Sequence, residues 1–474
     1  MISFKLIDLI IISLFFFTVL LIGFISGKKT KNDPDEYLLN GRKVGLFVFV
    51  LTNVSTWYGG ILGIGEFTYR YGLESWFTQG LPYYVFAFLF ALFFAKKVRA
   101  AKLFTIPDKL SQVYGKKTAV ISAFIVFVLV SPAPYLLMTA NLLGLIFKTN
   151  TIISLVLALL LSLIYLFKGG YRSDLYANVF QFFVMFAGFI IIVVISYFSF
   201  GGYSYLEMHL PANHLKMTGG ASPVYLVVWF LIALWTFADP GFHQRSYAAK
   251  SGSVAVKGIL ISIIFFALFD FLTTTTGLYA RASLPDLSQP VLSFPLFAER
   301  ALSPGIKGFF YAALFATIMS TLNSFLFLSG TTIGRDFIFR LFPNSEERRL
   351  KPYTIIGLII SGIISVILAY LIPSVIEIWY LIGSVCIPGI ILAVVSAYYP
   401  KFKIPSGFMI AEMITAVGAS IVWYYLRKNF SNVPVLSSLE PMVIGLLFAI
   451  AIHIVGMFYK RRVKRSGFPD FPCR

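Results

Sequence analysis

Cysteine and histidine are scarce in this sequence, which has two cysteines and four histidines among 474 residues. Cys386 and Cys473 lie far apart along the chain, so no disulfide framework is indicated. No group of histidine and cysteine has the spacing of a transition-metal site. The histidines also belong to no acid-rich motif such as His-x-x-x-x-Asp. A membrane-embedded transferase needs a convergent set of His, Asp or Glu, so that class remains a distant alternative.

Charged residues are scarce as well. They make up only 12% of the chain, whereas hydrophobic residues make up 58% and aromatic residues 17%. A soluble domain cannot bury that much apolar surface, but a bilayer accommodates it. Long hydrophilic segments are missing, because the longest loops, 96–117, 201–221 and 281–305, have about 20 residues each. A soluble catalytic module needs more chain than that, so the protein is expected to work within the membrane.

Apolar runs of roughly 20 residues, in contrast, fill nearly the whole chain, and each is long enough to cross about 30 Å of hydrocarbon. The runs are continuous, which predicts helices and not barrel strands. The first run has no small-residue cleavage site before Lys28, so it is expected to be a membrane helix. The sequence predicts an all-α polytopic membrane protein with about 13 transmembrane helices, near 6–26, 44–69, 76–95, 118–147, 151–167, 175–199, 222–241, 254–280, 306–334, 353–372, 375–398, 405–426 and 440–459.

Basic residues are distributed unevenly between the two sets of loops that alternating spans create. The set that begins with 28–43 and ends with the tail from Lys460 carries 30 of the 39 lysines and arginines. This asymmetry places that set in the cytoplasm, with the N-terminus outside the cell's inner (plasma) membrane and the C-terminus inside it. The net charge of +19 is therefore explained by the orientation of the protein in the membrane, and binding to nucleic acid is not expected. The basic tail Lys460–Arg465 is expected to contact anionic membrane lipid.

Two segments interrupt the apolar pattern, Ser55–Gly65 with its four glycines and Trp235–Gly241 with an Asp-Pro-Gly sequence. Glycine lowers the cost of leaving a helix, and proline removes a backbone donor. Unwound backbone at membrane depth is tolerated where it lines a wet cavity. Five spans separate the two segments, as in transporters built from inverted repeats. Close packing at small residues is the alternative explanation, and a passive channel is disfavoured because paired broken helices indicate alternating access.

Six short motifs occur in order between residues 34 and 400, and each is weak alone. They are Asp35–Arg42, Glu74–Trp76, Thr105–Asp108, Gly169–Gly170, Gln244–Ser251 and Met319–Ser324, the last followed by Asp336. Together they resemble the sodium:solute symporters, a family that includes sodium/sugar, sodium/proline, pantothenate and sialic acid transporters. The resemblance implies a secondary active transporter, not an enzyme, that couples sodium entry to uptake of a small organic solute by alternating access.

The family resemblance also implies a fold, the five-plus-five inverted repeat of the leucine transporter, as a monomer or weak homo-oligomer. One extra helix precedes the repeats and two follow them. The expected organisation is an N-terminal helix and first cytoplasmic loop in 1–43, repeat one in 44–200, an extracellular loop in 201–221, repeat two in 222–398, and two peripheral helices with a basic cytoplasmic tail in 399–474.

A sodium site follows from the resemblance residue by residue. Sodium is a hard cation that takes oxygens from unwound backbone and neighbouring hydroxyls. The family pattern implies the carbonyls of Ser55, Tyr58 and Thr317 and the hydroxyls of Ser320 and Thr321. Thr317 and Ser320 are three residues apart, so they share a helix face. The alternative for such hydroxyls is a bond to the carbonyl four residues earlier in the same helix.

A second sodium, which some family members hold near an aspartate, is not expected. The matching position here is Asn178, so one sodium ion per solute is predicted. Asp174, one turn earlier, is a candidate to substitute for that aspartate, but it is close to Arg172 and is therefore interpreted as half of a solvated ion pair.

The solute is expected between the broken helices. Two positions that hold sugar in the sodium/sugar members match Leu62 and Ile232, and an apolar side chain leaves a sugar hydroxyl unpaired. An amino acid, a carboxylate or a vitamin is therefore favoured over a sugar. Trp57 and Trp235 are candidates for the walls of the solute pocket, although aromatic residues in membrane helices also serve simply to pack.

Asp239 and Asp270 are acids within apolar spans, and intramembrane acids indicate function. Asp239 is a candidate for solute contact, for proton binding or for capping of a half-helix. Asp270 precedes four threonines, whose hydroxyls are expected to satisfy its carboxylate. The alternative function is a proton-coupled symporter of the same fold that uses Asp239 or Asp270.

Overall fold

The protein is seen here in a computed structural model that describes residues 2–28, 30, 33–341, 349–430 and 439–465. Within those residues it is 84% helical and has no strand. The helices longer than nine residues are α1 (Leu6–Gly27), α3 (Leu46–Ser55), α4 (Ile61–Tyr71), α6 (Leu81–Phe90), α9 (Lys116–Leu129), α10 (Ala133–Phe147), α11 (Thr151–Phe200), α13 (Pro223–Ile232), α16 (Gly252–Ser283), α18 (Ile306–Thr331), α19 (Leu350–Leu371), α20 (Val375–Tyr398), α21 (Ser406–Asn429) and α23 (Pro441–Arg465).

Shorter helices complete the chain between these elements. They are α2 (Pro34–Leu39), η1 (Asn40–Arg42), α5 (Glu74–Gln79), η2 (Ala91–Ala95), α7 (Lys96–Ala101), α8 (Ile106–Tyr114), α12 (Tyr203–His209), α14 (Trp235–Ala238), α15 (Pro240–Ala248), η3 (Pro290–Leu292), α17 (Ser293–Ala301), η4 (Thr332–Phe339) and η6 (Pro400–Phe402).

Eleven helical segments among the described residues are long and apolar enough to cross a membrane. Two differences separate this number from the predicted thirteen. The run predicted at 44–69 is divided into α3 and α4, which are each too short to be counted as a full span. The runs predicted at 151–167 and 175–199 join in α11, where Gly170 has a φ of 54° and interrupts the helix. The all-helical membrane fold is confirmed, and the exact number of spans stays a prediction.

Both predicted interruptions are present. Residues 56–60 are not helical and separate α3 from α4. In the second segment α13 ends at Ile232, and Asp239 has an extended backbone between α14 and α15. A third interruption, at residues 130–132 between α9 and α10, was not predicted, although the sequence Ser131-Pro132-Ala133-Pro134 signals it. Three broken helices, and not two, therefore surround the centre of the molecule.

The two predicted broken helices are tied together at one end by backbone hydrogen bonds. Val44 N–H donates to Ala248 C=O at 3.1 Å, and Lys250 N–H donates to Val44 C=O at 2.9 Å. These bonds form a parallel bridge between Val44 and Ala249. The start of α3 and the end of α15 are thus held as one unit at the side predicted to be cytoplasmic.

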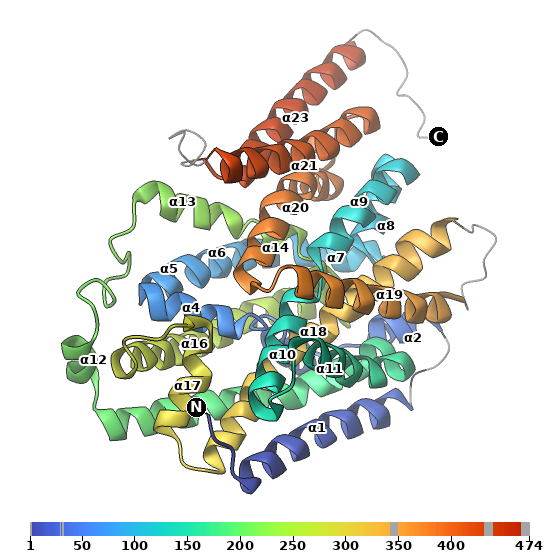
Figure 1. Ribbon diagram of the computed structural model, residues 1–474. Coiled ribbons are helices and arrows are strands. Elements are labelled where there is room, and N and C mark those ends of the chain that lie inside the picture. The colour runs from blue at the N-terminus through green and yellow to red at the C-terminus, as the bar shows by residue number, and fades with distance from the viewer. Residues whose placement is uncertain (1, 29, 31–32, 342–348, 431–438, 466–474) are drawn as a thin grey trace.

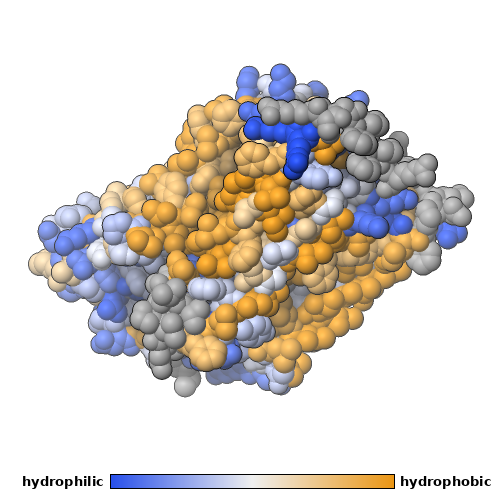
Figure 2. Space-filling view, turned by 90° about the horizontal axis from the view of Figure 1, so that it is seen from above, coloured by the Kyte–Doolittle hydropathy of each residue, from blue (hydrophilic) through white to orange (hydrophobic). Residues whose placement is uncertain are grey.

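Apolar side chains cover most of the face seen in Figure 2, with hydrophilic residues toward its margins. Such a surface suits contact with lipid. The N-terminal helix α1 lies along the outside of α11, and α21 and α23 lie together on another side of the molecule (Figure 1). A Cβ added to Gly27 of α1 would lie 3.0 Å from Gly169 Cα, so the two backbones are in close contact.

Candidate ion and solute site

Hydroxyls of α18 meet the unwound segment that follows α3, as the sodium prediction requires. The Ser320 hydroxyl donates to the carbonyls of Ser55 at 2.7 Å and Thr317 at 2.9 Å. The Thr321 hydroxyl donates to the carbonyl of Thr56 at 2.9 Å. Neither hydroxyl bonds to the carbonyl four residues earlier, which was the alternative for this pair. Ser320 thus joins two of the predicted carbonyls, one of them three residues earlier in its own helix, and Thr321 reaches the carbonyl next to Ser55, all in a buried place.

Gly59 permits this close approach between the unwound segment and α18. A Cβ at Gly59 would lie 2.2 Å from Thr321 Cβ and 2.3 Å from its hydroxyl oxygen. The sequence did not predict a role for the Thr56 carbonyl. Its contact with Thr321 depends on the path of the unwound backbone after Ser55, and that path cannot be read from the sequence. The predicted carbonyl of Tyr58 has no recorded contact with either hydroxyl, while the Tyr58 hydroxyl donates to Phe266 C=O at 2.6 Å.

The interpretation of Asp174 as half of a solvated ion pair is wrong. Asp174 is fully buried, and its Oδ2 accepts a hydrogen bond from the Ser324 hydroxyl at 2.6 Å. The side-chain nitrogen of Asn178 donates to the same hydroxyl at 3.3 Å. Arg172 instead donates to Asn40 Oδ1 at 3.4 Å. Asp174 thus faces Ser324 of α18, which lies one helical turn after Ser320.

A cavity of about 510 Å³ lies between the three broken helices. Trp57, Trp235 and Asp239, the predicted solute candidates, all line it, and so does Ile232. Leu62 does not, because its side chain is fully buried elsewhere. The argument against a sugar therefore rests on Ile232 alone. The third interruption also contributes to the lining, through Ser131, Pro134 and Tyr135.

Asp239 caps the half-helix α15, which was one of its three predicted roles. Its Oδ1 accepts from Phe242 N–H at 2.7 Å, and its Oδ2 accepts from the indole N–H of Trp235 at 2.7 Å. Both carboxylate oxygens thus have donors from the chain itself. The bond to Trp235 also fixes the indole ring that lines the cavity.

The expectation that threonine hydroxyls satisfy Asp270 is wrong. The Thr273 hydroxyl donates to the backbone carbonyl of Asp270, and Thr276 donates to Leu272 C=O at 2.8 Å. The carboxylate instead accepts a hydrogen bond from Tyr84, a residue of α6 that the sequence did not single out. Asp270 lines the same cavity as Asp239.

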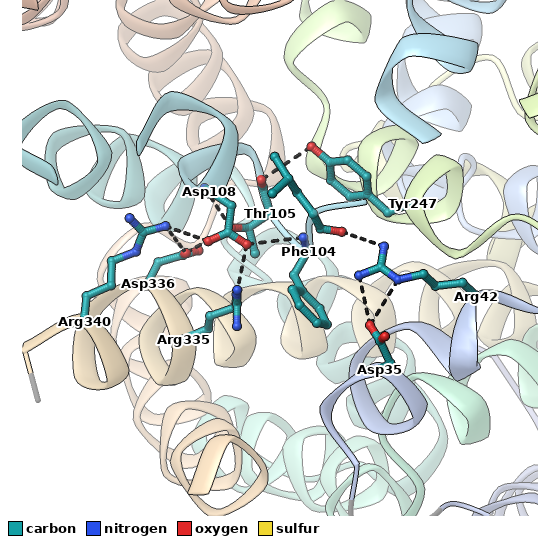
Figure 3. A network of polar contacts seen from close by, with 10 residues as sticks. Asp35, Arg42, Phe104, Thr105, Asp108, Tyr247, Arg335, Asp336 and Arg340 are labelled. Carbon is teal, nitrogen blue, oxygen red and sulfur yellow. Dashed lines mark hydrogen bonds and ion pairs between the residues drawn. The ribbon is translucent and has the colours of Figure 1, made fainter. Parts of the chain in front are cut away.

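Residues of four of the sequence motifs meet in a polar network away from the cavity (Figure 3). Asp108 of α8 pairs with Arg335 at 2.9 Å and with Arg340 at 2.8 Å. The Thr105 hydroxyl donates to Asp336 Oδ1 at 2.9 Å, which ties α8 to η4 a second time. We call this group, with Asp108, Thr105, Arg335, Asp336 and Arg340, the clamp.

The motif around Arg42 reaches the same loop. Arg42 pairs with Asp35 at 2.9 Å and donates to the Leu103 carbonyl at 2.9 Å. The Phe104 ring lies between two guanidinium groups, 4.9 Å from that of Arg42 and 4.1 Å from that of Arg335. Cation–π contacts thereby hold the loop that precedes α8 in place.

The cavity and the clamp lie on opposite sides of the broken helices. Trp229 of α13 and Glu377 in the first turn of α20 belong to the cavity wall, and the Glu377 side chain is 47% exposed. The uneven distribution of basic residues predicts that α13 and α20 begin on the outside and that the clamp lies in the cytoplasm. Paired broken helices, a group of buried oxygens and a cavity between those helices are features of a secondary transporter.

Solved structures share this fold. A Na⁺-coupled sialic acid symporter in a substrate-bound, outward-open state matches 98% of this chain and 99% of its own chain, with a TM-score of 0.82 and 18% identity. Mhp1, a nucleobase-cation-symport-1 family transporter, matches with a TM-score of 0.60 and 13% identity, over 93% of this chain and 96% of its own. These likenesses show the fold of the leucine transporter class.

Sequence comparison gives the family. Sodium/proline symporters of Staphylococcus aureus are 22% identical to this chain over 477 residues, which is 94% of this chain and 91% of the relative. The sequence model of the sodium:solute symporter family matches residues 37–414. The chain belongs to the sodium:solute symporter family. It is a multi-pass membrane transporter of small organic solutes that couples to sodium, and not an enzyme.

Proposed function

We propose that this protein carries one small organic solute into the cell together with sodium, and that the coupling ion binds between α3 and α18. Its ligands are the carbonyls of Ser55, Tyr58 and Thr317 and the hydroxyls of Ser320 and Thr321. The observation that supports this site is the pair of hydrogen bonds from Ser320 to Ser55 and Thr317. A sodium ion replaces the hydroxyl protons as the positive partner of these carbonyls, so the same oxygens turn toward it.

The site is neutral, which suits an ion that has to leave again. Carbonyl and hydroxyl oxygens coordinate sodium without the strong attraction of a carboxylate. The buried Asp174 carboxylate, one turn away, is the one observation that favours a second ion. Asp174 supplies a negative charge, which Asn178 lacks. The predicted stoichiometry of one sodium ion per solute therefore requires that Asp174 does not bind a second ion.

The solute class that we propose is an amino acid, a carboxylate or a vitamin, as the sequence favoured. The related Staphylococcus aureus protein is a sodium/proline symporter, which is consistent with an amino acid. The cavity wall combines aromatic rings such as that of Trp57 with polar side chains such as Asn53 and Gln79, so the argument against a sugar remains that of Ile232.

We infer alternating access from the positions of the cavity and the clamp on opposite sides of the broken helices. While the clamp is closed, solute and ion enter from the side that the cavity faces. Release on the other side requires the ion pairs of Asp108 to open. When an ion pair opens, its carboxylate and its guanidinium group become hydrated. The energy barrier to opening therefore reflects the replacement of protein partners by water.

The experiment that tests this proposal uses the purified protein. A thermal-stability screen against amino acids, carboxylates, vitamins and sugars, with and without sodium, identifies the solute, because a ligand of the folded state raises its apparent stability. Uptake of that solute into proteoliposomes is expected to require a sodium gradient. Uptake that persists without sodium and collapses with a proton ionophore would select the proton-coupled alternative at Asp239 or Asp270.

A further inference from the structure

Asp270 is the carboxylate of the cavity whose bonding capacity the protein does not use up. It is 8% exposed and lines the cavity from α16. Asp239, by contrast, has a donor on each oxygen. In the part of the chain that the structure describes, no lysine, arginine or histidine forms an ion pair with Asp270. A buried carboxylate without a cation is costly, so a partner from outside the chain would stabilise it.

Neighbouring groups hold the Asp270 carboxylate in a fixed direction. Tyr84 donates to its Oδ2, and the Trp76 indole N–H donates in turn to the Tyr84 hydroxyl at 3.2 Å. A Cβ at Gly80 would lie 2.9 Å from the same Oδ2, so the glycine between α5 and α6 leaves room for the carboxylate. This chain of donors orients Oδ2, and the Tyr58 hydroxyl also lies within hydrogen-bonding reach of the carboxylate, but none of these neutral groups balances its charge.

The surroundings of Asp270 in the cavity suit an organic cation. The rings of Trp57, Tyr58 and Tyr83 line the same cavity, and the centroids of Trp57 and Tyr83 lie 5.4 Å apart. Aromatic faces attract ammonium groups through the ring quadrupole. Gln79 also lines the cavity, and its buried side-chain nitrogen has no hydrogen-bond partner among the described residues. It offers a donor for an oxygen of the same ligand.

We propose that Asp270 receives the ammonium group of the transported solute, with the aromatic rings around it and Gln79 as a donor beside it. The solute is accordingly an amine that is protonated at neutral pH. An amino acid meets this requirement, whereas a simple carboxylate or a neutral vitamin does not. The inference rests on the proposed function, since it assigns the solute of that same cavity, but it concerns a different residue from the sodium site.

The probes that test the assignment are matched pairs that differ in one charge. The panel contains the proteinogenic amino acids, pyrrolidine and putrescine, each beside its N-acetylated form. L-Proline is also paired with tetrahydrofuran-2-carboxylate, in which an ether oxygen replaces the ammonium nitrogen. Thermal stability and equilibrium binding are measured in saturating sodium. Only compounds with a free amine are expected to raise the thermal stability of the protein. In each pair that binds, the affinity of the uncharged compound should be at least tenfold lower than that of the amine.

Variants connect this selectivity to the carboxylate. Asp270→Asn is expected to weaken binding of the free amine at least tenfold and to leave its acetylated form unchanged. Asp270→Glu keeps the charge and is expected to retain part of the affinity. Ser262→Ala is the matched control on the same helix, because the Ser262 hydroxyl donates only to Gly258 C=O at 2.8 Å. Binding of ²²Na⁺ without solute is expected to be equal in all of these proteins.

Each other outcome overturns the assignment. If no free amine stabilises the protein, if an amine-free compound binds best, or if Asp270→Asn binds the amine like the parent, Asp270 does not hold an ammonium group. Proton release from Asp270 on solute binding, with amine affinity unchanged in the Asn variant, would assign the residue to proton transfer instead. Absence of ²²Na⁺ binding to the parent protein would refute sodium as the coupling ion. The conclusion about Asp270 would still be decided by the amine-binding measurements alone.

Discussion

The Ser320 hydroxyl lies 2.7 Å from the carbonyl oxygen of Ser55, although 265 residues separate them in the sequence. The bond connects an unbroken helix to the unwound end of a broken one. The hydroxyl has a single proton to share between the carbonyls of Ser55 and Thr317, whereas an ion at the same place attracts all five oxygens of the proposed site at once. Ion binding thereby fixes the position of the unwound segment relative to α18.

Replacement of both hydroxyls tests this relationship. Ser320→Ala with Thr321→Ala removes two of about five ligand oxygens, and each buried group costs on the order of 1–3 kcal/mol. Sodium binding is expected to weaken by roughly two orders of magnitude or more. A sodium ion that crosses about 100 mV releases about 2.3 kcal/mol, and a tenfold gradient adds about 1.4. The several hundredfold solute accumulation that this energy sustains should disappear in the variant.

The control for the double variant lies further along α18. Ser329→Ala with Thr331→Ala removes the same chemical groups, and Ser329 donates to Val130 C=O at 3.3 Å, away from the unwound segment after α3. Solute binding at saturating sodium should survive in both proteins. Unchanged sodium dependence in the Ser320 and Thr321 variant would place the coupling ion elsewhere and favour the proton-coupled alternative.

The number of sodium ions is measured by the cooperativity of uptake. One ion per solute predicts a Hill coefficient for sodium near one in proteoliposomes. Because Asp174 is buried beside Ser324, Asp174→Asn separates the two possibilities. Under the one-ion prediction the parent and the variant share a coefficient near one. A parent value near two that falls to one in Asp174→Asn would establish a second ion and refute the prediction.

The clamp is expected to control which side of the cavity is open. Asp108→Asn removes the charge that pairs with Arg335 and Arg340, and loss of one partner in a largely buried pair costs about 3 kcal/mol. The equilibrium between the two open states should shift by tenfold or more toward the cytoplasmic side. A reporter cysteine at the fully buried Ser246 should then react faster with a permeant maleimide.

Asp33→Asn is the control for the clamp, since Asp33 lies outside it and caps α2 by accepting from Glu36 N–H at 3.3 Å. It changes the charge by the same amount on the same predicted side. Equal maleimide rates in the Asp108 and Asp33 variants would show that the clamp does not hold the cytoplasmic side closed.

Orientation in the membrane is tested by chemical labelling. In a background without Cys386 and Cys473, a cysteine at Lys117 should react with an impermeant reagent only from the cytoplasm, and one at Ser288 only from outside. Both side chains are exposed. The expectation derives from the uneven distribution of basic residues. Labelling of both positions from one side would reject the thirteen-span topology and the predicted ends of the chain.

The sequence predicted the parts of the site that depend on local pattern. The Ser320 and Thr321 hydroxyls were implied by the family resemblance of one local motif, and the two main breaks were predicted from glycine and proline. The break before α10 carried the same signal in Ser131–Pro134 but lay inside a long apolar run, which favours an unbroken helix.

The parts that could not be predicted depend on partners far apart in the chain. Tyr84 and Asp270 are separated by 186 residues, and Thr105 and Asp336 by 231. No periodicity relates such positions, so the carboxylate of Asp270 was assigned to its threonine neighbours instead. Asp174 was misread for a similar reason, because its burial results from the packing of α11 against α18 and not from its own neighbours. The repeat boundaries at 44–200 and 222–398 stay a prediction.

The backbone bridge between Val44 and Ala249 has a consequence for how such a protein can diverge. Its two hydrogen bonds use main-chain atoms of Val44, Ala248 and Lys250, so the donors are lost only when proline replaces Val44 or Lys250. The residues around the cavity are therefore free to change while the two broken helices remain joined at one end. Selectivity for a new solute can then arise through point mutations without loss of the mechanical link that transmits movement from one broken helix to the other.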